Sequence, residues 1–173
     1  MKRSLYEEYL QDGRFSSCPI IDIHGHMGAY AAISFPLCAP ERMVREMDRR
    51  GVAFLLFSHH ASLFVPEAGN RPAVEAVRRF PSHFLAYWAV NPHHTRGDRE
   101  LAETASCRDA CCGFKFHPDF HATPLTHDRY RPFWEYAEAE HLIVLSHTWA
   151  GSPFCGERQV AALRDRVAAM PWR

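Results

Sequence analysis

The chain has 173 residues, 47% of them hydrophobic and 13% aromatic, which is enough for one compact domain with a substantial core. Lysine plus arginine equals aspartate plus glutamate at 20 each, so the charge gives no indication of a nucleic-acid or membrane partner. Glu7 and Glu8 interrupt the N-terminal segment before a secretory signal can form. We therefore expect a single cytoplasmic domain over residues 1–173, with residues 1–18 as a leader.

The leader is predicted to contain a short amphipathic helix within residues 5–15, placed at the bottom or side of the fold. A strand follows at about residues 19–24 and leads into His-Gly-His. Side chains alternate along a strand, so Asp22, His24 and His26 are expected on one face. Two imidazoles on one face are suited to hold a single metal ion. The alternative is a pair of solvated loop histidines after a core strand.

The rest of the chain alternates helical segments with short apolar runs. Each apolar run is typical of a buried parallel strand and leads into polar residues. Five β-then-α units predict an α/β fold with parallel strands and right-handed crossovers. The predicted strands lie at 19–24, 52–57, 84–90, 113–118 and 142–147, and the helices that follow them at 40–50, 71–80, 100–110, 132–140 and 157–170.

Two architectures have such units: part of a (β/α)8 barrel, or an open flavodoxin-like sheet. No glycine-rich phosphate loop follows the first strand, so a nucleotide site has no support. Barrels of this kind carry their sites at the carboxyl ends of the strands, where many of the 12 histidines lie.

Several candidate site residues lie at these strand ends. Lys115 and His117 are predicted on one face of their strand, opposite Phe114 and Phe116. His147 follows the fifth apolar run as His24 and His26 follow the first, and either histidine of the Ser-His-His after residue 57 is a candidate for pocket lining. The side chains expected to border a substrate pocket are His59, His93, His117 and Trp149.

The run Ile-Ile-Asp-Ile-His-Gly-His resembles the first-strand signature of the amidohydrolase superfamily, in its amidohydrolase-related branch (amidohydrolase family 2). The resemblance implies a metal-dependent (β/α)8 barrel. It places His24 and His26 as strand 1 ligands and His147, within Ile-Val-Leu-Ser-His-Thr, as the strand 5 ligand. Zinc is the expected ion, with manganese or iron as alternatives. The same resemblance places Lys115 inside the barrel, as a bridge between two metals when carboxylated, as a partner of a substrate carboxylate, or as a charged interior residue of unassigned role.

The activity that this resemblance implies is hydrolysis of a small molecule by metal-activated water. Decarboxylation, which the same branch supports, is an alternative, and a non-catalytic metal-binding fragment is another. The family's strand 6 histidine and strand 8 aspartate have no counterpart in this sequence. We therefore expect a barrel truncated after its fifth β/α unit, with strands 6–8 absent. The open edges of such a sheet have unpaired backbone groups, so we expect another chain or segment to cover them. A second copy of the chain, in a homo-oligomer, is one such cover.

Overall fold

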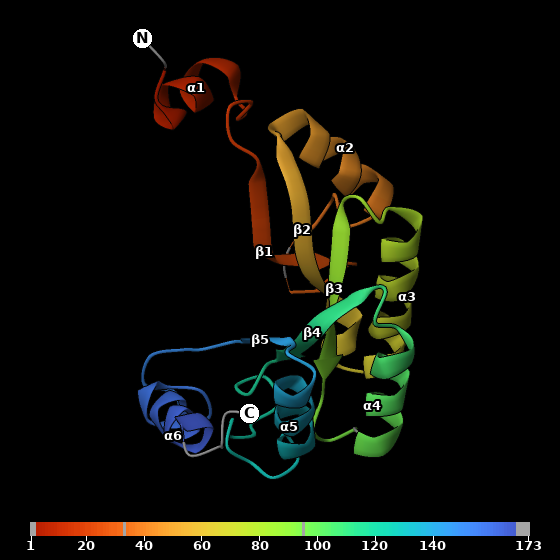
Figure 1. Ribbon diagram of the computed structural model, residues 1–173, viewed down its shortest axis with the longest axis vertical. Coiled ribbons are helices and arrows are strands. Elements are labelled where there is room, and N and C mark those ends of the chain that lie inside the picture. The colour runs from red at the N-terminus through yellow and green to blue at the C-terminus, as the bar shows by residue number, and fades with distance from the viewer. Residues whose placement is uncertain (1–2, 33, 95, 169–173) are drawn as a thin grey trace.

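The computed structural model of the chain describes residues 3–32, 34–94 and 96–168. In these residues five strands alternate with α-helices along the chain (Figure 1). The strands are β1 (Ile20–Met27), β2 (Val52–His59), β3 (Phe84–Val90), β4 (Cys111–Phe116) and β5 (Ile143–Ser146). The helices are α1 (Leu5–Asp12), α2 (Pro40–Arg50), the 3-10 turn η1 (His60–Leu63), α3 (Pro66–Arg79), α4 (Gly97–Ser106), α5 (Arg131–Ala139) and α6 (Glu157–Ala168).

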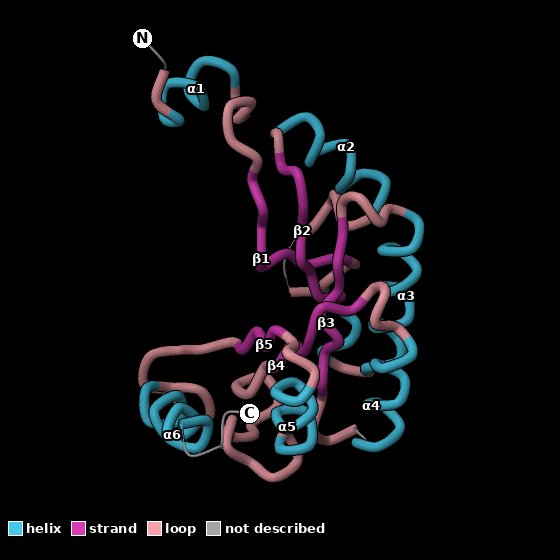
Figure 2. Tube along the Cα trace, in the orientation of Figure 1, coloured by secondary structure: helices cyan, strands magenta, loops and turns pink. Residues whose placement is uncertain are grey.

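The strands form one parallel sheet in the order β1-β2-β3-β4-β5. Helices α2, α3 and α4 lie along one side of the curled sheet, and the other side is open in this view (Figures 1 and 2). A flavodoxin-like sheet has its first strand inside the order, with helices on both faces. The sequential order therefore confirms the predicted partial (β/α)8 barrel.

The core lies between the sheet and its helices. Phe57, Phe84, Phe114 and Phe116 point from the strands into this layer and are fully buried. Phe133 of α5 packs edge-on against Phe114, with ring centroids 5.3 Å apart. Because strand side chains alternate, the residues between these phenylalanines point to the opposite, concave face. The packing of the core thus decides which side chains can form a site.

Several element boundaries differ from the prediction by a few residues, and two of these differences affect the site or its support. Strand β1 continues to Met27, so both histidines of His-Gly-His lie within the strand. Helix α3 begins at Pro66, before the predicted residue 71, because Pro66 occupies its first turn and Gly69 packs against the backbone of Ser62. A Cβ atom at Gly69 would lie 2.3 Å from the Ser62 nitrogen, so this glycine is required by a close approach. The end of the last predicted helix, residues 169–170, lies outside the described residues.

Helix α1 lies beyond the amino end of β1 and away from the helices that cover the sheet (Figure 1). Ser4 and Glu7 form a capping box at its start, and Gly13 ends it in the left-handed conformation. Tyr6 is 72% exposed, so the expected capping of the barrel by an apolar helix face is not seen. No helix in the described residues is long and apolar enough to cross a membrane.

Candidate active site

The two histidines of β1 lie next to each other. Their ring centroids are 5.1 Å apart, with the ring planes tilted by 46°. The pairing of β1 with β2 is irregular between Asp22 and Gly25, and the Asp22 carboxylate accepts a hydrogen bond from the backbone N–H of His24 at 2.9 Å. This local irregularity is where the strand presents His24 and His26 together.

Lys115 of β4 reaches the same place from across the sheet. It lies between Phe114 and Phe116, which face the helices, so its own side chain points to the concave face. Its Nζ lies 3.3 Å from Nε2 of His24, and it is only 2% exposed. Burial lowers the pKa of the Lys115 ammonium to about 8. The predicted alternation along this strand is confirmed.

A second group of rings lies where β4 and β5 end. The rings of His117 and His147 are stacked, with centroids 4.1 Å apart and planes 12° from parallel. The ring of Trp149 lies 6.2 Å beyond His147, again nearly parallel. The backbone N–H of His147 donates to the carbonyl of Phe116 and so continues the pairing of the two strands. Three residues selected from the sequence are therefore adjacent here.

His59 and His60, at the end of β2, have different contacts. His60 is buried and stacks on His26, with ring centroids 4.9 Å apart, and its Nδ1 lies 2.7 Å from the carbonyl oxygen of Gly28. The ring of His59 lies against Gly28, and its Nδ1 accepts from the backbone N–H of Ala61. The residue that supports His26 is thus His60, which was a candidate in the sequence but was not selected for the pocket.

His93 joins two loops. Its Nε2 lies 2.6 Å from the carbonyl oxygen of His121 and 3.3 Å from Oγ1 of Thr123, so it ties the loop after β3 to the loop after β4. His121 in turn lies 2.7 Å, through its Nε2, from the carbonyl oxygen of Leu63. Among the described residues, no ring contact links His93 to His24 or to the histidines around it. The structure places His93 in the support of the rim.

The imidazoles at the site are held in their neutral form. Burial is the main cause that lowers the pKa of His26 to about 4, and the neighbouring His60 adds to it. Burial and the ammonium of Lys115 also lower the pKa values of His24 and His147. Neutral imidazoles have a free nitrogen lone pair, which is the form that binds a metal ion.

The described residues contain no group of three or more His, Cys, Asp or Glu side chains already arranged to hold a metal ion. The donor chemistry nevertheless fits a divalent cation, because His24 and His26 are adjacent neutral imidazoles and the Asp22 carboxylate lies beside them. The third predicted ligand, His147, is stacked on His117.

Comparison with known proteins identifies the architecture. No protein-family profile and no curated protein matches the chain. Among solved structures, a 5-carboxyvanillate decarboxylase from Novosphingobium aromaticivorans matches 91% of the chain with a TM-score of 0.65 and 12% identity. The fold is that of part of an amidohydrolase barrel. A structure of amidohydrolase II matches 84% of the chain with a TM-score of 0.59 and 12% identity. A probable 2-pyrone-4,6-dicarboxylic acid hydrolase from Acinetobacter baumannii matches 88%, with a TM-score of 0.61 and 13% identity.

The match to the amidohydrolase fold extends over part of each neighbour. The chain covers 57% of the decarboxylase, 56% of amidohydrolase II and 55% of the probable hydrolase. It therefore spans little more than half the length of these solved structures. Hydrolases and decarboxylases both occur among these neighbours, so the fold agrees with the predicted resemblance and leaves the reaction open.

Proposed function

We propose that the chain belongs to the amidohydrolase-related family and carries the first part of the active site of a metal-dependent hydrolase that acts on a small molecule. The observation that supports this most directly is the convergence of His24, His26 and Lys115 from β1 and β4 on the concave face of a half-barrel. These residues are far apart in the sequence, and β1 and β4 are not neighbours in the sheet. The curvature of the sheet brings their side chains together.

We propose His24, His26 and His147 as the ligands of one divalent ion. A divalent cation, when bound, polarises a substrate carbonyl and makes a nearby water more acidic. Matched decarboxylase structures contain manganese, so Mn²⁺ is as suitable a probe as Zn²⁺. His147 is stacked on the ring of His117. Stacking covers the face of the His147 ring, and a ring nitrogen binds a metal ion through its edge, so the two contacts are compatible.

Two further side chains are proposed to handle substrate and protons. Lys115, with its pKa lowered to about 8, still holds a proton at neutral pH and presents a buried ammonium to a substrate carboxylate. Burial and the neighbouring His147 lower the pKa of His117 to about 4, so its ring is neutral. Its Nδ1 accepts the backbone N–H of Phe120, which leaves the proton of the neutral ring on Nε2. His117 is therefore proposed as a hydrogen-bond donor to substrate through Nε2.

Decarboxylation is the second candidate, and one observation favours it. A buried ammonium beside the histidine pair is complementary to the carboxylate that a decarboxylase has to hold, and two of the solved neighbours are named 5-carboxyvanillate decarboxylases. Hydrolysis and decarboxylation use the same proposed ligands, so they are distinguished by product. Release of carbon dioxide identifies the second reaction.

Metal binding is the test of the proposal. The chain is dialysed against Zn²⁺ or Mn²⁺ and its metal content measured, with the double variant His24→Ala/His26→Ala alongside. We expect one ion per wild-type chain and less than about a tenth of that in the double variant, because two of three ligands are removed. His141→Asn is the matched control, since His141 is exposed and has a φ of 52° that asparagine tolerates. A chain without metal after dialysis would overturn the proposal, and metal binding without turnover on carboxylic acids, esters or amides would favour the non-catalytic alternative.

A further inference from the structure

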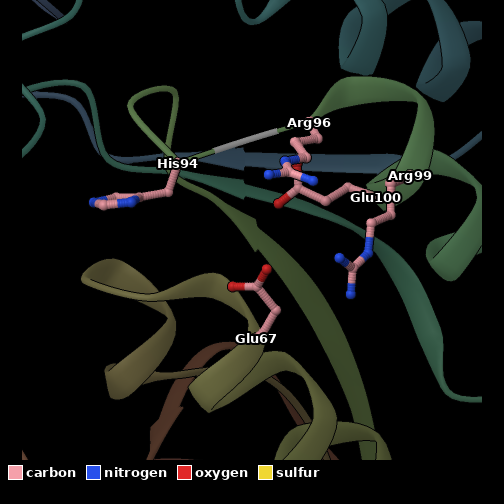
Figure 3. A pocket seen from close by; sticks show the side chains of 5 residues that line it. All are labelled: Glu67, His94, Arg96, Arg99 and Glu100. Atoms are coloured by element: carbon pink, nitrogen blue, oxygen red, sulfur yellow. The ribbon is translucent and has the colours of Figure 1, made fainter.

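A second polar pocket lies between the amino ends of α3 and α4 (Figure 3). Its volume is about 250 Å³, and none of its lining residues is among the proposed metal ligands or the residues stacked on them. Glu67 points into it from the first turn of α3, and Arg99 and Glu100 reach it from α4. His94 and Arg96, from the loop after β3, complete the lining.

Glu100 is the unusual member of this pocket. Glu100 is only 6% exposed, and its Oε2 has no hydrogen-bond partner among the described residues. Burial raises the pKa of this carboxyl to about 7, and the negative charges of Glu67 and Glu103 add to the effect. The charge of Arg99 and the backbone N–H of Arg96 act in the opposite direction. A buried polar atom without a partner is rare in native structures, and a bound water, ion or ligand is one explanation for it. Among the atoms of this kind in the described residues, Glu100 Oε2 is the one that belongs to a residue lining this pocket.

The charges that face Glu100 indicate what that ligand is. Arg99 is committed to Glu103, with Nε 2.9 Å from Oε1. The guanidinium of Arg96 has no hydrogen-bond or ion-pair partner within the described part of the chain, and no side chain caps the start of α4. Guanidinium groups and uncapped helix amino ends both favour oxyanions. A protonated Glu100 supplies a hydrogen-bond donor beside them. When Glu100 is ionised, its charge and that of Glu67 on the opposite wall repel an anion.

We propose that this pocket binds a small oxyanion, a carboxylate or a tetrahedral oxyanion, through Arg96, the amino end of α4 and the protonated carboxyl of Glu100. Ionisation of Glu100 adds a third negative charge to those of Glu67 and Glu103 and expels the anion. Binding is therefore stronger on the acid side of neutrality. The site is separate from the proposed metal ligands and does not depend on them.

The test is a titration of the full chain with acetate and, separately, with sulfate at pH 6 and pH 8, followed by the backbone amide NMR signals of α4. Both anions keep their charge over this range, so the protein alone causes any pH dependence. With a pKa of about 7, the protonated fraction of Glu100 falls about tenfold from pH 6 to pH 8. We expect the affinity of the wild type to fall by about the same factor.

Two variants and a control make the result specific. Both forms of the protein are compared in a His94→Gln background, which removes the other lining side chain able to change charge between pH 6 and pH 8. In that background Glu100→Gln keeps a neutral donor at both pH values, so its affinity should change less than about twofold. Arg96→Gln should lose most of the binding at both pH values, and Arg45→Gln, an exposed arginine of α2, should change nothing. Acetate binding alone assigns a carboxylate ligand, and sulfate binding alone assigns a tetrahedral oxyanion. Binding of neither anion, or binding that Arg96→Gln leaves unchanged, would overturn the proposal.

Discussion

The side chain of Asn70 completes the carboxyl half of β3. Pairing between β2 and β3 ends where Phe57 meets Ala86. Three residues further along β3, Asn70 of α3 donates from Nδ2 to the carbonyl of Ala89 at 2.9 Å and accepts the N–H of Ala89 at 3.0 Å. Asn70 is 1% exposed, so water does not compete for these bonds. The amide thus takes the place of a neighbouring strand just below the site.

Asn70→Ala removes both hydrogen bonds and leaves a buried N–H and a buried C=O on Ala89. Each such group costs roughly 1–3 kcal/mol when its partner is lost. Alanine regains about 0.5 kcal/mol through its higher helix propensity. The free energy of unfolding should therefore fall by about 1.5–5.5 kcal/mol.

Urea denaturation followed by circular dichroism measures this loss. Glu75→Ala is the matched control, because Glu75 lies exposed on the same helix. It should change the free energy of unfolding by no more than about 0.5 kcal/mol. A loss below about 1 kcal/mol for Asn70→Ala would refute the view that its amide substitutes for strand pairing.

Two further predictions concern charge. Lys115→Met should raise the pKa of His24, because a nearby positive charge is removed. The NMR signals of the His24 ring recorded against pH measure this pKa. An unchanged or lower pKa of His24 would contradict the contact between the two side chains. The Glu8 carboxylate accepts hydrogen bonds from Ser16 and Ser17, which lower its pKa from 4.5 to about 2. A carboxyl whose pKa falls on folding stabilises the fold above pH 4.5 and loses that effect as the pH falls toward 2. Urea midpoints should therefore show Glu8→Gln less stable than wild type at pH 6, with the difference shrinking between pH 4.5 and pH 2; a difference independent of pH would contradict this.

The alternation of apolar runs and helices was sufficient to predict the sheet, because buried parallel strands have a simple pattern. The sequence also placed Lys115 on the face opposite Phe114, since the period of a strand is fixed. It did not distinguish His59 from His60. The 3-10 turn that begins at His60 ends the alternation of side chains along the strand. The directions in which the His59 and His60 rings point therefore depend on a turn that the sequence pattern does not indicate.

Other features were missed because they depend on contacts between distant segments. The predicted helix begins at residue 71 because the helical spacing of apolar residues starts there, and Gly69 and Asn70 before it are poor helix residues. Gly69 is needed for its approach to Ser62, and Asn70 is needed for its bonds to Ala89. Both requirements come from tertiary contacts that local propensity does not contain.

The central claim is that His24, His26 and His147 are the ligands of one divalent ion. Mn²⁺ added below one equivalent broadens the NMR signals of nuclei close to it, so the ring signals of the bound histidines identify the site. The account predicts that the signals of these three rings broaden first, together with those of His60 and His117, which are stacked on His26 and His147. The signals of His83 and His141 should stay sharp. Broadening that reaches His83 or His141 first, or no broadening at all, would contradict it.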